Sequence, residues 1–198
     1  DMNDQSSNRR FLLLCAALVV AIAVVDLVAV LRITNNHDFA VYYKAALRLR
    51  NGEDIFAEAG AFRAQIEQGV STKTEDTPWP FSYPPFLAAP ILPLSYLPYA
   101  WASAVWTGFC LAALALCCWL ALRSQNWLTL SGFIVAVLLL YQFQPAVVAL
   151  RLGQMDIAVF LLLTLAFWWL RSGQDGKAGL ALGIAIGVKF FAGFVVAY

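Results

Sequence analysis

The stretch NNHDFAVYYKAA, residues 35–46, follows directly on the first long apolar run of the chain, residues 11–31. It is therefore the first polar segment to emerge from a membrane that this run spans. Aromatic and apolar side chains recur with helical spacing from Phe39 to Leu49, and Gly52 is placed to end the helix. The stretch predicts an amphipathic helix at the membrane surface.

Asp38 stands where this helix should begin, and its carboxylate has two interpretations. A carboxylate at this point can accept hydrogen bonds from the free N–H groups of the first turn and act as an N-cap. An acidic side chain on a membrane surface, above a buried apolar bundle, is also what a lipid-using enzyme needs. Local chemistry alone favours the N-cap, and both interpretations stay open.

The composition is that of a polytopic membrane protein. The 198 residues are 62% hydrophobic and only 13% charged, whereas soluble domains carry about 25% charged residues. The formal net charge of +1 argues against a nucleic-acid partner. Four cysteines lie inside apolar runs without the spacing of a zinc site, which favours small buried hydrophobes: Cys15, Cys110, Cys117 and Cys118.

Apolar runs and the polar segments between them divide the chain into spans and loops. We expect one membrane module over residues 1–198, the N-terminal part of a longer protein, with a cytoplasmic N-terminus because Arg9 and Arg10 precede the first run. A large external loop, residues 32–82, carries amphipathic helices. Residues 84–97 are short and proline-rich, which favours a re-entrant or interfacial helix. The expected transmembrane helices are residues 11–31, 99–122, 128–150, 157–170 and 178–198.

The positive-inside rule favours a topology in which residues 84–97 do not cross the membrane. Three basic residues near the ends of later spans then lie inside and Arg151 lies outside, whereas a crossing segment would reverse all four. The non-crossing topology places the loop that carries Asp38 and residues 151–156 together on the external face. The three basic residues expected inside are Arg123, Arg171 and Lys177.

This topology brings acids and bases to one side of the membrane. Asp38, Arg151 and Asp156 share the external side, and Lys189 lies about midway along the last span or nearer the outer face. One interpretation is a cavity for an anionic lipid headgroup, in which Arg151 and Lys189 hold a phosphate and Asp38 takes a proton from an attacking hydroxyl. In the other, Arg151 snorkels and Asp156 caps the following helix. Lys189 then pairs with Asp26 inside the membrane.

Several classes of function lack their sequence motifs. The chain has no phosphate loop, Rossmann glycine pattern or zinc-protease motif, and no convincing set of metal ligands, so we expect no cofactor. An external enzyme has no ATP or nucleotide sugar at hand, and its donor would be lipid-linked. No internal inverted repeat is visible, which weakens a transporter interpretation.

Three stretches point to one family. The first is DFAVYYKAA, which starts at Asp38 and leads to NGEDIF at residues 51–56. The second is YPP at residues 83–85, with further prolines up to residue 98. The third is GQMD at residues 153–156, with Lys189 beyond it. In order and spacing these stretches resemble the polyprenol-phosphate-sugar-dependent glycosyltransferases of the GT-C superfamily, in particular glycosyltransferase family 87.

The resemblance implies an all-α, GT-C-like bundle with about five transmembrane helices in a bacterial plasma membrane. It implies a catalytic aspartate in the large first external loop, at the position of Asp38, and a second external acid at Asp156. The expected reaction is an inverting transfer of a hexose, most simply mannose, from a polyprenyl-phosphate donor to a hydroxyl of a glycolipid or glycan acceptor.

In that reaction Asp38 is the expected general base. The substrate-binding candidates are Arg151, Lys189, Gln154, Asp156, Tyr42, Tyr43 and Tyr83, and packing is the alternative role for at least two of the tyrosines. Two other functions remain as alternatives. A carrier or flippase for a lipid-linked sugar would use the same cationic cavity without a base, and in a non-catalytic membrane subunit Asp38 would be only a cap.

Overall fold

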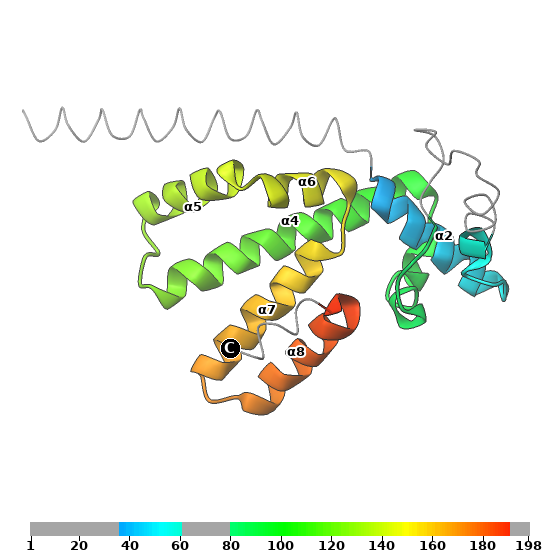
Figure 1. Ribbon diagram of the computed structural model, residues 1–198. Coiled ribbons are helices and arrows are strands. Elements are labelled where there is room, and N and C mark those ends of the chain that lie inside the picture. The colour runs from blue at the N-terminus through cyan, green and yellow to red at the C-terminus, as the bar shows by residue number, and fades with distance from the viewer. Residues whose placement is uncertain (1–35, 61–79, 191–198) are drawn as a thin grey trace, which may run out of the picture.

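The computed structural model describes residues 36–60 and 80–190 (Figure 1). The expected first span, residues 11–31, lies outside the described residues, as do residues 61–79 and 191–198. The regular elements of the described part are all helical, which confirms the all-α expectation there. They are α2 (His37–Asn51), the short 3-10 helices η1 (Pro85–Leu87) and η2 (Leu92–Tyr96), α4 (Tyr99–Ser124), α5 (Leu130–Gln142), α6 (Gln144–Leu152), α7 (Asp156–Arg171) and α8 (Asp175–Val188).

Helix α4 is the long central element (Figure 1). Its 26 residues reach about 39 Å, enough to cross the hydrocarbon layer of a bilayer. One stripe of small and aromatic side chains is buried, including Ala102, Trp106 and Cys110. Large apolar side chains such as Val105 and Phe109 are exposed on its other faces. A helix that is apolar all round and only partly buried suits a lipid environment.

The expected span at residues 128–150 is broken in the structure. Its two halves are α5 and α6, which meet at an angle of 70° and count as one broken span or as a re-entrant loop. Phe143 leaves the helical conformation, and Pro145 stands in the first turn of α6. Proline supplies no N–H to the preceding turn and its ring crowds that turn, so a continuous helix cannot form here.

Among the described residues, α4 is one candidate membrane span and the α5–α6 pair is a second. Helices α7 and α8 have 16 and 14 residues, which corresponds to about 24 and 21 Å, less than the hydrocarbon thickness of about 30 Å. Within the expected span 178–198, the helix α8 ends at Val188 and Lys189 has extended backbone angles.

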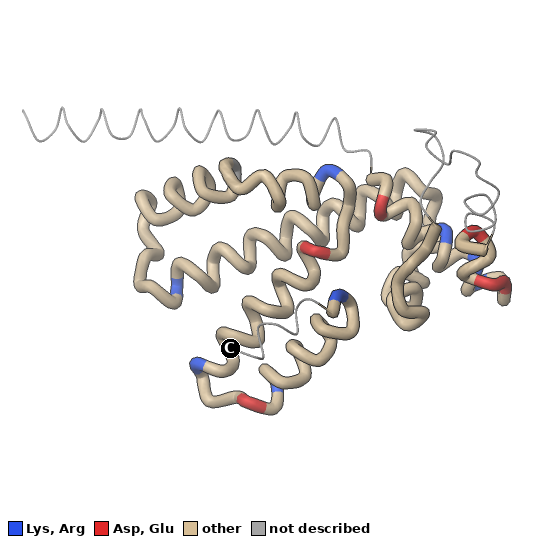
Figure 2. Tube along the Cα trace, in the orientation of Figure 1, with Lys and Arg blue, Asp and Glu red and all other residues tan. Residues whose placement is uncertain are grey.

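The helices bring charged residues to opposite ends of the bundle. Arg123, near the C-terminus of α4, lies over the rings of Trp119 and Trp168, at 5.0 and 5.7 Å from their centroids, so the C-terminal ends of α4 and α7 meet. Arg171 ends α7 at the same place. The N-terminal ends of α4 and α7 meet α2 at the opposite end. Figure 2 shows the charged residues of α4, α6, α7 and α8 near helix ends, with uncharged helix bodies between them.

Helix α2 packs across the N-terminal end of α4 through aromatic rings (Figure 1). Phe39 is fully buried, and its ring stacks on Trp106 at 5.5 Å between centroids. Gly52 ends the helix with a φ of 71°, and its N–H reaches the carbonyls of Arg48 and Leu49, which confirms the expected helix end. The observed helix, His37–Asn51, is slightly longer than the expected pattern from Phe39 to Leu49.

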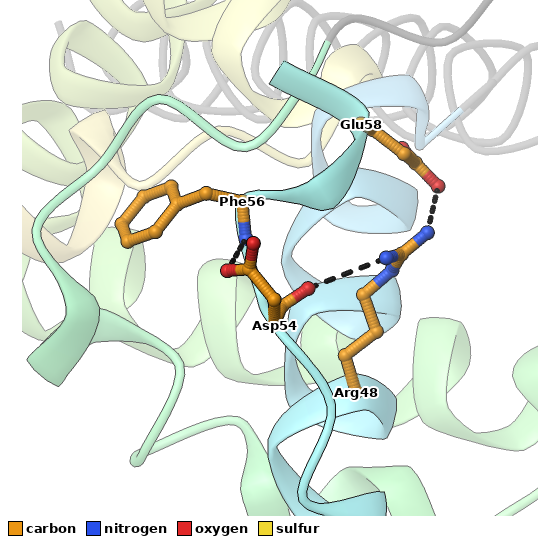
Figure 3. Close-up of polar contacts among 4 residues, drawn as sticks. All are labelled: Arg48, Asp54, Phe56 and Glu58. Atoms are coloured by element: carbon orange, nitrogen blue, oxygen red, sulfur yellow. Dashed lines mark hydrogen bonds and ion pairs between the residues drawn. The ribbon is translucent and has the colours of Figure 1, made fainter. Parts of the chain in front are cut away.

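The turn after α2 is held by polar contacts of Arg48 (Figure 3). Its guanidinium donates to the carbonyl oxygen of Asp54 at 3.3 Å and pairs with the carboxylate of Glu58 at 3.0 Å. The side chain of Asp54 in turn accepts the N–H of Phe56 at 2.9 Å. These contacts fold the NGEDIF stretch back onto the end of α2.

Residues 83–97, here called the strap, contain η1 and η2 rather than an α-helix. Four prolines explain the short 3-10 turns, because each proline lacks an N–H for an α-helical ladder. The Tyr42 hydroxyl donates to the Tyr83 hydroxyl at 3.1 Å, and the Tyr43 hydroxyl donates to the Leu97 carbonyl at 2.7 Å. The strap therefore begins and ends beside consecutive residues of α2, and its topology relative to the membrane stays a prediction.

Candidate functional site

The site is built where α2 meets α4 and the turn between α6 and α7. Asn36 joins all three: its backbone N–H donates to the carbonyl of Arg151 at 3.2 Å, and its side-chain amide donates to Ser103 and Thr107 on α4. It is 5% exposed, and its left-handed φ of 41° turns the chain into α2. Asn36 therefore fixes where α2 begins relative to the bundle.

Gly153, in the turn between α6 and α7, lies against the start of α2. A side chain there would come within 2.9 Å of Asn36 Oδ1 and of Phe39 Cβ, and its φ of 69° favours glycine. Its carbonyl accepts the indole N–H of Trp106 at 2.9 Å in a buried hydrogen bond. The GQMD stretch thus starts with a glycine because two other elements approach its backbone closely.

Asp38 is not the N-cap of α2, because Asn36 occupies that position and makes no side-chain capping bond. Asp38 lies in the first turn and is half-buried. A carboxylate there is stabilised by the helix dipole without being consumed by a capping hydrogen bond. The geometry therefore shows that Asp38 is not the N-cap residue, and it leaves the carboxylate in the first turn of the helix.

Tyr42 lies one turn after Asp38 and is 1% exposed. Its pKa is raised well above the ordinary tyrosine range, first by burial, then by the hydrogen bond to Tyr83, with a smaller contribution from the negative charge of Asp38. The backbone amide of Met155 acts in the opposite direction. Tyr42 is therefore a neutral hydroxyl that links Asp38, the strap and the α6–α7 turn.

Asp156 and Lys189 form an ion pair between α7 and α8. Lys189 Nζ lies 2.6 Å from Asp156 Oδ1 and 2.8 Å from Oδ2, and the side chains are 22% and 31% exposed. Asp156 begins α7 and Lys189 follows the last residue of α8, so each charge also has the favourable sign for its helix end. Asp26, the partner considered from the sequence, lies outside the described residues.

The other expected site residues occupy different positions around this end of the bundle. Arg151 has an exposed side chain at the end of α6, and Gln154 is half-buried in the following turn. Figure 1 shows the ends of α6 and α8 apart, and Lys189 forms its ion pair with Asp156. Tyr43 and Tyr83 serve as anchors of the strap, as described above.

Sequence reasoning did not single out Asn36, Trp106 or Gly153 as site residues, nor Phe86 of the strap, whose ring lies against Gly187 of α8. Asn36 carried a usable signal, since asparagine is among the best N-caps and tolerates a left-handed backbone. The contacts of the other three join segments far apart in sequence, and no local pattern reveals them. Within the described ranges, no group of three or more His, Cys, Asp or Glu side chains is placed to hold a metal.

The arrangement combines the Asp38 carboxylate in the first turn of α2, the neutral buried hydroxyl of Tyr42, and the Lys189–Asp156 ion pair. All lie toward one end of an apolar bundle. A carboxylate can accept a proton from a hydroxyl, and a lysine ammonium can bind a phosphate. Such a site suits a phosphorylated lipid that approaches from the membrane.

Comparison with known proteins finds similarity to glycosyltransferases. The model of glycosyltransferase family 87 matches residues 81–198, which contain the strap, Asp156 and Lys189 but not Asp38. A polyprenol-phosphate-mannose-dependent alpha-(1-2)-phosphatidylinositol pentamannoside mannosyltransferase of Mycobacterium tuberculosis (strain CDC 1551 / Oshkosh) is 28% identical over 129 residues. That alignment covers 64% of this chain and 29% of the relative. No solved structure matches significantly.

Proposed function

The chain belongs to glycosyltransferase family 87, and from that premise we propose that the protein transfers mannose from a polyprenyl-phosphate donor to an acceptor hydroxyl. The named activity of the mycobacterial relative supports mannose and a polyprenyl phosphate as the donor. The acceptor is a glycolipid or glycan; the relative is named for a phosphatidylinositol mannoside acceptor.

In the proposed reaction Asp38 is the general base. It takes the proton of the acceptor hydroxyl as the acceptor oxygen bonds to the anomeric carbon of the sugar. The bond between that carbon and the phosphate oxygen breaks, and polyprenyl phosphate leaves with the electron pair. A single displacement of this kind inverts the configuration at the anomeric carbon.

Lys189 is the cation proposed for the donor phosphate, since an ammonium stabilises the negative charge that grows on the leaving group. Asp156 holds Lys189 when no donor is present. The exposed Arg151 and the half-buried Gln154 would contact the donor or acceptor at the rim of the site. Tyr42 would line the site beside Asp38. Tyr43 and Tyr83 act mainly by anchoring the strap through their hydrogen bonds to Leu97 and Tyr42.

One observation carries this proposal: α2 is docked so that Asp38 lies at the same end of the bundle as the Asp156–Lys189 pair. The contacts of Asn36 with Arg151 and of Tyr42 with the Met155 amide produce that docking. Residues from two distant parts of the sequence thereby lie toward the same end of the apolar helices. The three basic residues of the expected cytoplasmic side, Arg123, Arg171 and Lys177, lie toward the other end.

The proposed membrane arrangement has about five transmembrane helices, a cytoplasmic N-terminus and an external site in a bacterial plasma membrane. Helix α4 and the α5–α6 pair are the candidate spans that support it among the described residues. Cysteine accessibility from either side, at positions next to Asp38 and next to Arg171, tests the sidedness. Labelling of both positions from the same side would contradict it.

The transfer itself is tested with membranes that contain the full-length protein, a polyprenyl phosphate carrying labelled mannose, and candidate glycolipid acceptors. We expect label to move into a glycolipid or glycan product in a protein-dependent way. A carrier or flippase would move the intact labelled donor between leaflets without forming a new glycosidic bond. That result would replace the transferase proposal.

A further inference from the structure

The strap reaches from α2 to α8 and touches α8 beside Lys189. The Phe86 ring lies over Gly187, with its Cζ atom 3.1 Å from the position that a Cβ on this glycine would occupy. Gly187 precedes Lys189 by two residues, and Phe86 is 52% exposed. An aromatic ring thus rests on bare helix backbone two residues before the proposed phosphate-binding lysine.

This contact closes a ring of interactions around the site. Tyr42 of α2 bonds to Tyr83 of the strap, the strap touches α8 through Phe86, and Lys189 pairs with Asp156 at the start of α7. The Met155 amide, just before α7, interacts with Tyr42 and so completes the cycle of contacts. Three of the four contacts are hydrogen bonds or an ion pair, whereas Phe86 makes only an apolar contact with a residue that has no side chain.

The outer face of the strap is suited to lipid. Residues 83–97 contain no charged side chain, and their prolines are exposed together with large apolar groups. Phe86 and Leu97 are 52% and 38% exposed, and the exposed Tyr96 ring stacks under the guanidinium of Arg50 at 5.2 Å. A molecule that reached Lys189 past Phe86 would contact an apolar surface along its length and a cation at its end. An isoprenoid phosphate has the matching polarity, with an apolar chain and an anionic end.

We propose that Phe86 is the gate through which the isoprenoid phosphate of the donor reaches Lys189. The inference deepens the proposed function and rests on it. The anchors Tyr42 and Tyr43 hold the two ends of the strap, while the Phe86 ring swings off Gly187 to admit the phosphate. Closure afterwards places an aromatic ring between the Lys189 site and the surrounding lipid.

Two glycines of α8 provide a matched test. Gly187→Ala places a methyl group 3.1 Å from the Phe86 ring, which must then shift by a few tenths of an ångström, whereas Gly183→Ala adds the same methyl where no atom lies within 4 Å. Both changes raise helix propensity equally. Phe86→Ala removes the ring directly, and Phe86→Leu, which keeps an apolar side chain, guards against an effect of misfolding.

The measurement is the association rate of a long-chain polyprenyl monophosphate with the full-length protein in nanodiscs, with a short water-soluble isoprenyl phosphate as the second probe. We expect Phe86→Ala to raise the long-chain rate by about 2- to 10-fold, the range that loss of one aromatic contact allows, and Gly187→Ala to raise it less, because it shifts the ring without removing it. Gly183→Ala should match the wild type. The double variant Phe86→Ala with Gly187→Ala should have the same association rate as Phe86→Ala alone, because it has no aromatic ring for the new methyl group to displace.

The gate is refuted if all variants associate at the wild-type rate, or if the wild-type protein binds neither phosphate. Mannose transfer measured on the same preparations separates the two proposals. Transfer by the wild type with no effect of Phe86→Ala rejects the gate and keeps the transferase. A gate effect without any mannose transfer keeps the isoprenoid-phosphate site and rejects the transferase.

Discussion

Lys189 Nζ lies 2.6 Å from Asp156 Oδ1, although the two residues are 33 positions apart in the sequence. The pair joins the end of α8 to the start of α7 and places its charges at the end of the bundle where α2 docks. The same two residues are the proposed phosphate cation and its holder. A donor phosphate would therefore have to compete with a carboxylate that is already part of the protein.

Removal of one partner should destabilise the bundle more than loss of an ordinary surface ion pair. We expect Lys189→Met to lower the free energy of unfolding by about 1–3 kcal/mol, because it leaves a half-buried carboxylate without its partner. The double variant Asp156→Asn with Lys189→Met should recover part of that loss. Thermal unfolding in detergent measures both.

The Arg48–Glu58 pair supplies the control, since it is similarly exposed but lies within one local turn. Arg48→Met should cost less than about 1 kcal/mol. Equal losses for Arg48→Met and Lys189→Met would show that the α7–α8 pair contributes no more than a surface contact.

Gly153 should tolerate a side chain much less well than Gly173, although both have a φ of 69°. Gly173→Ala meets open space and should cost only about 1–2 kcal/mol for the left-handed backbone. Gly153→Ala also places a methyl group 2.9 Å from Asn36 and Phe39, so it should cost clearly more and shift α2 from its seat. Differential scanning fluorimetry of the two variants, together with protease sensitivity at the end of α2, measures the difference.

Burial of the Tyr42 hydroxyl should make the protein less stable at alkaline pH. Its pKa is raised in the folded state, so the unfolded chain releases this proton first, and stability should fall as the pH rises above about 10. The expected slope from this one group is about 1.4 kcal/mol per pH unit. Tyr42→Phe should remove that part of the slope.

The exposed Tyr96, which is 69% exposed, provides the matched control for this pH effect. Tyr96→Phe should leave the alkaline slope as in the wild type. The same slope in all three proteins would show that Tyr42 titrates normally and is not held neutral by its surroundings.

The parts of this account that sequence could predict are those set by local rules. The helical spacing from Phe39 and the glycine at position 52 predicted α2 and its end, because both signals act within a few residues. Pro145 was visible, but the 70° bend at the start of α6 depends on how the two halves pack against α4. The 3-10 turns of the strap likewise follow from its prolines, whereas its return to Tyr42 and Tyr43 does not.

The site required contacts that no local pattern encodes. The sequence offered Asp26 as one partner for Lys189, and only the packing of α7 on α8 shows Asp156 at hydrogen-bond distance. Asp38 was interpreted first as an N-cap, because its position differs from the true N-cap by only two residues and both residue types cap well. The docking of α2 through Asn36 resolves that ambiguity, since it fixes which residue begins the helix.

The central claim is that Asp38 acts as the base, and its most direct test is the rate of mannose transfer by Asp38→Asn. Asparagine keeps the size of the side chain, and the contacts of Asn36 that dock α2 are untouched, so folding should be preserved. Glu58→Gln is the control for loss of a carboxylate near α2 outside the proposed site. Membranes with matched protein levels receive labelled polyprenyl-phosphate mannose, and label in glycolipid product is followed. We expect transfer to fall by about 100-fold or more in Asp38→Asn and to persist in Glu58→Gln. Equal transfer by wild type and Asp38→Asn would contradict it and make Asp156 the next candidate base.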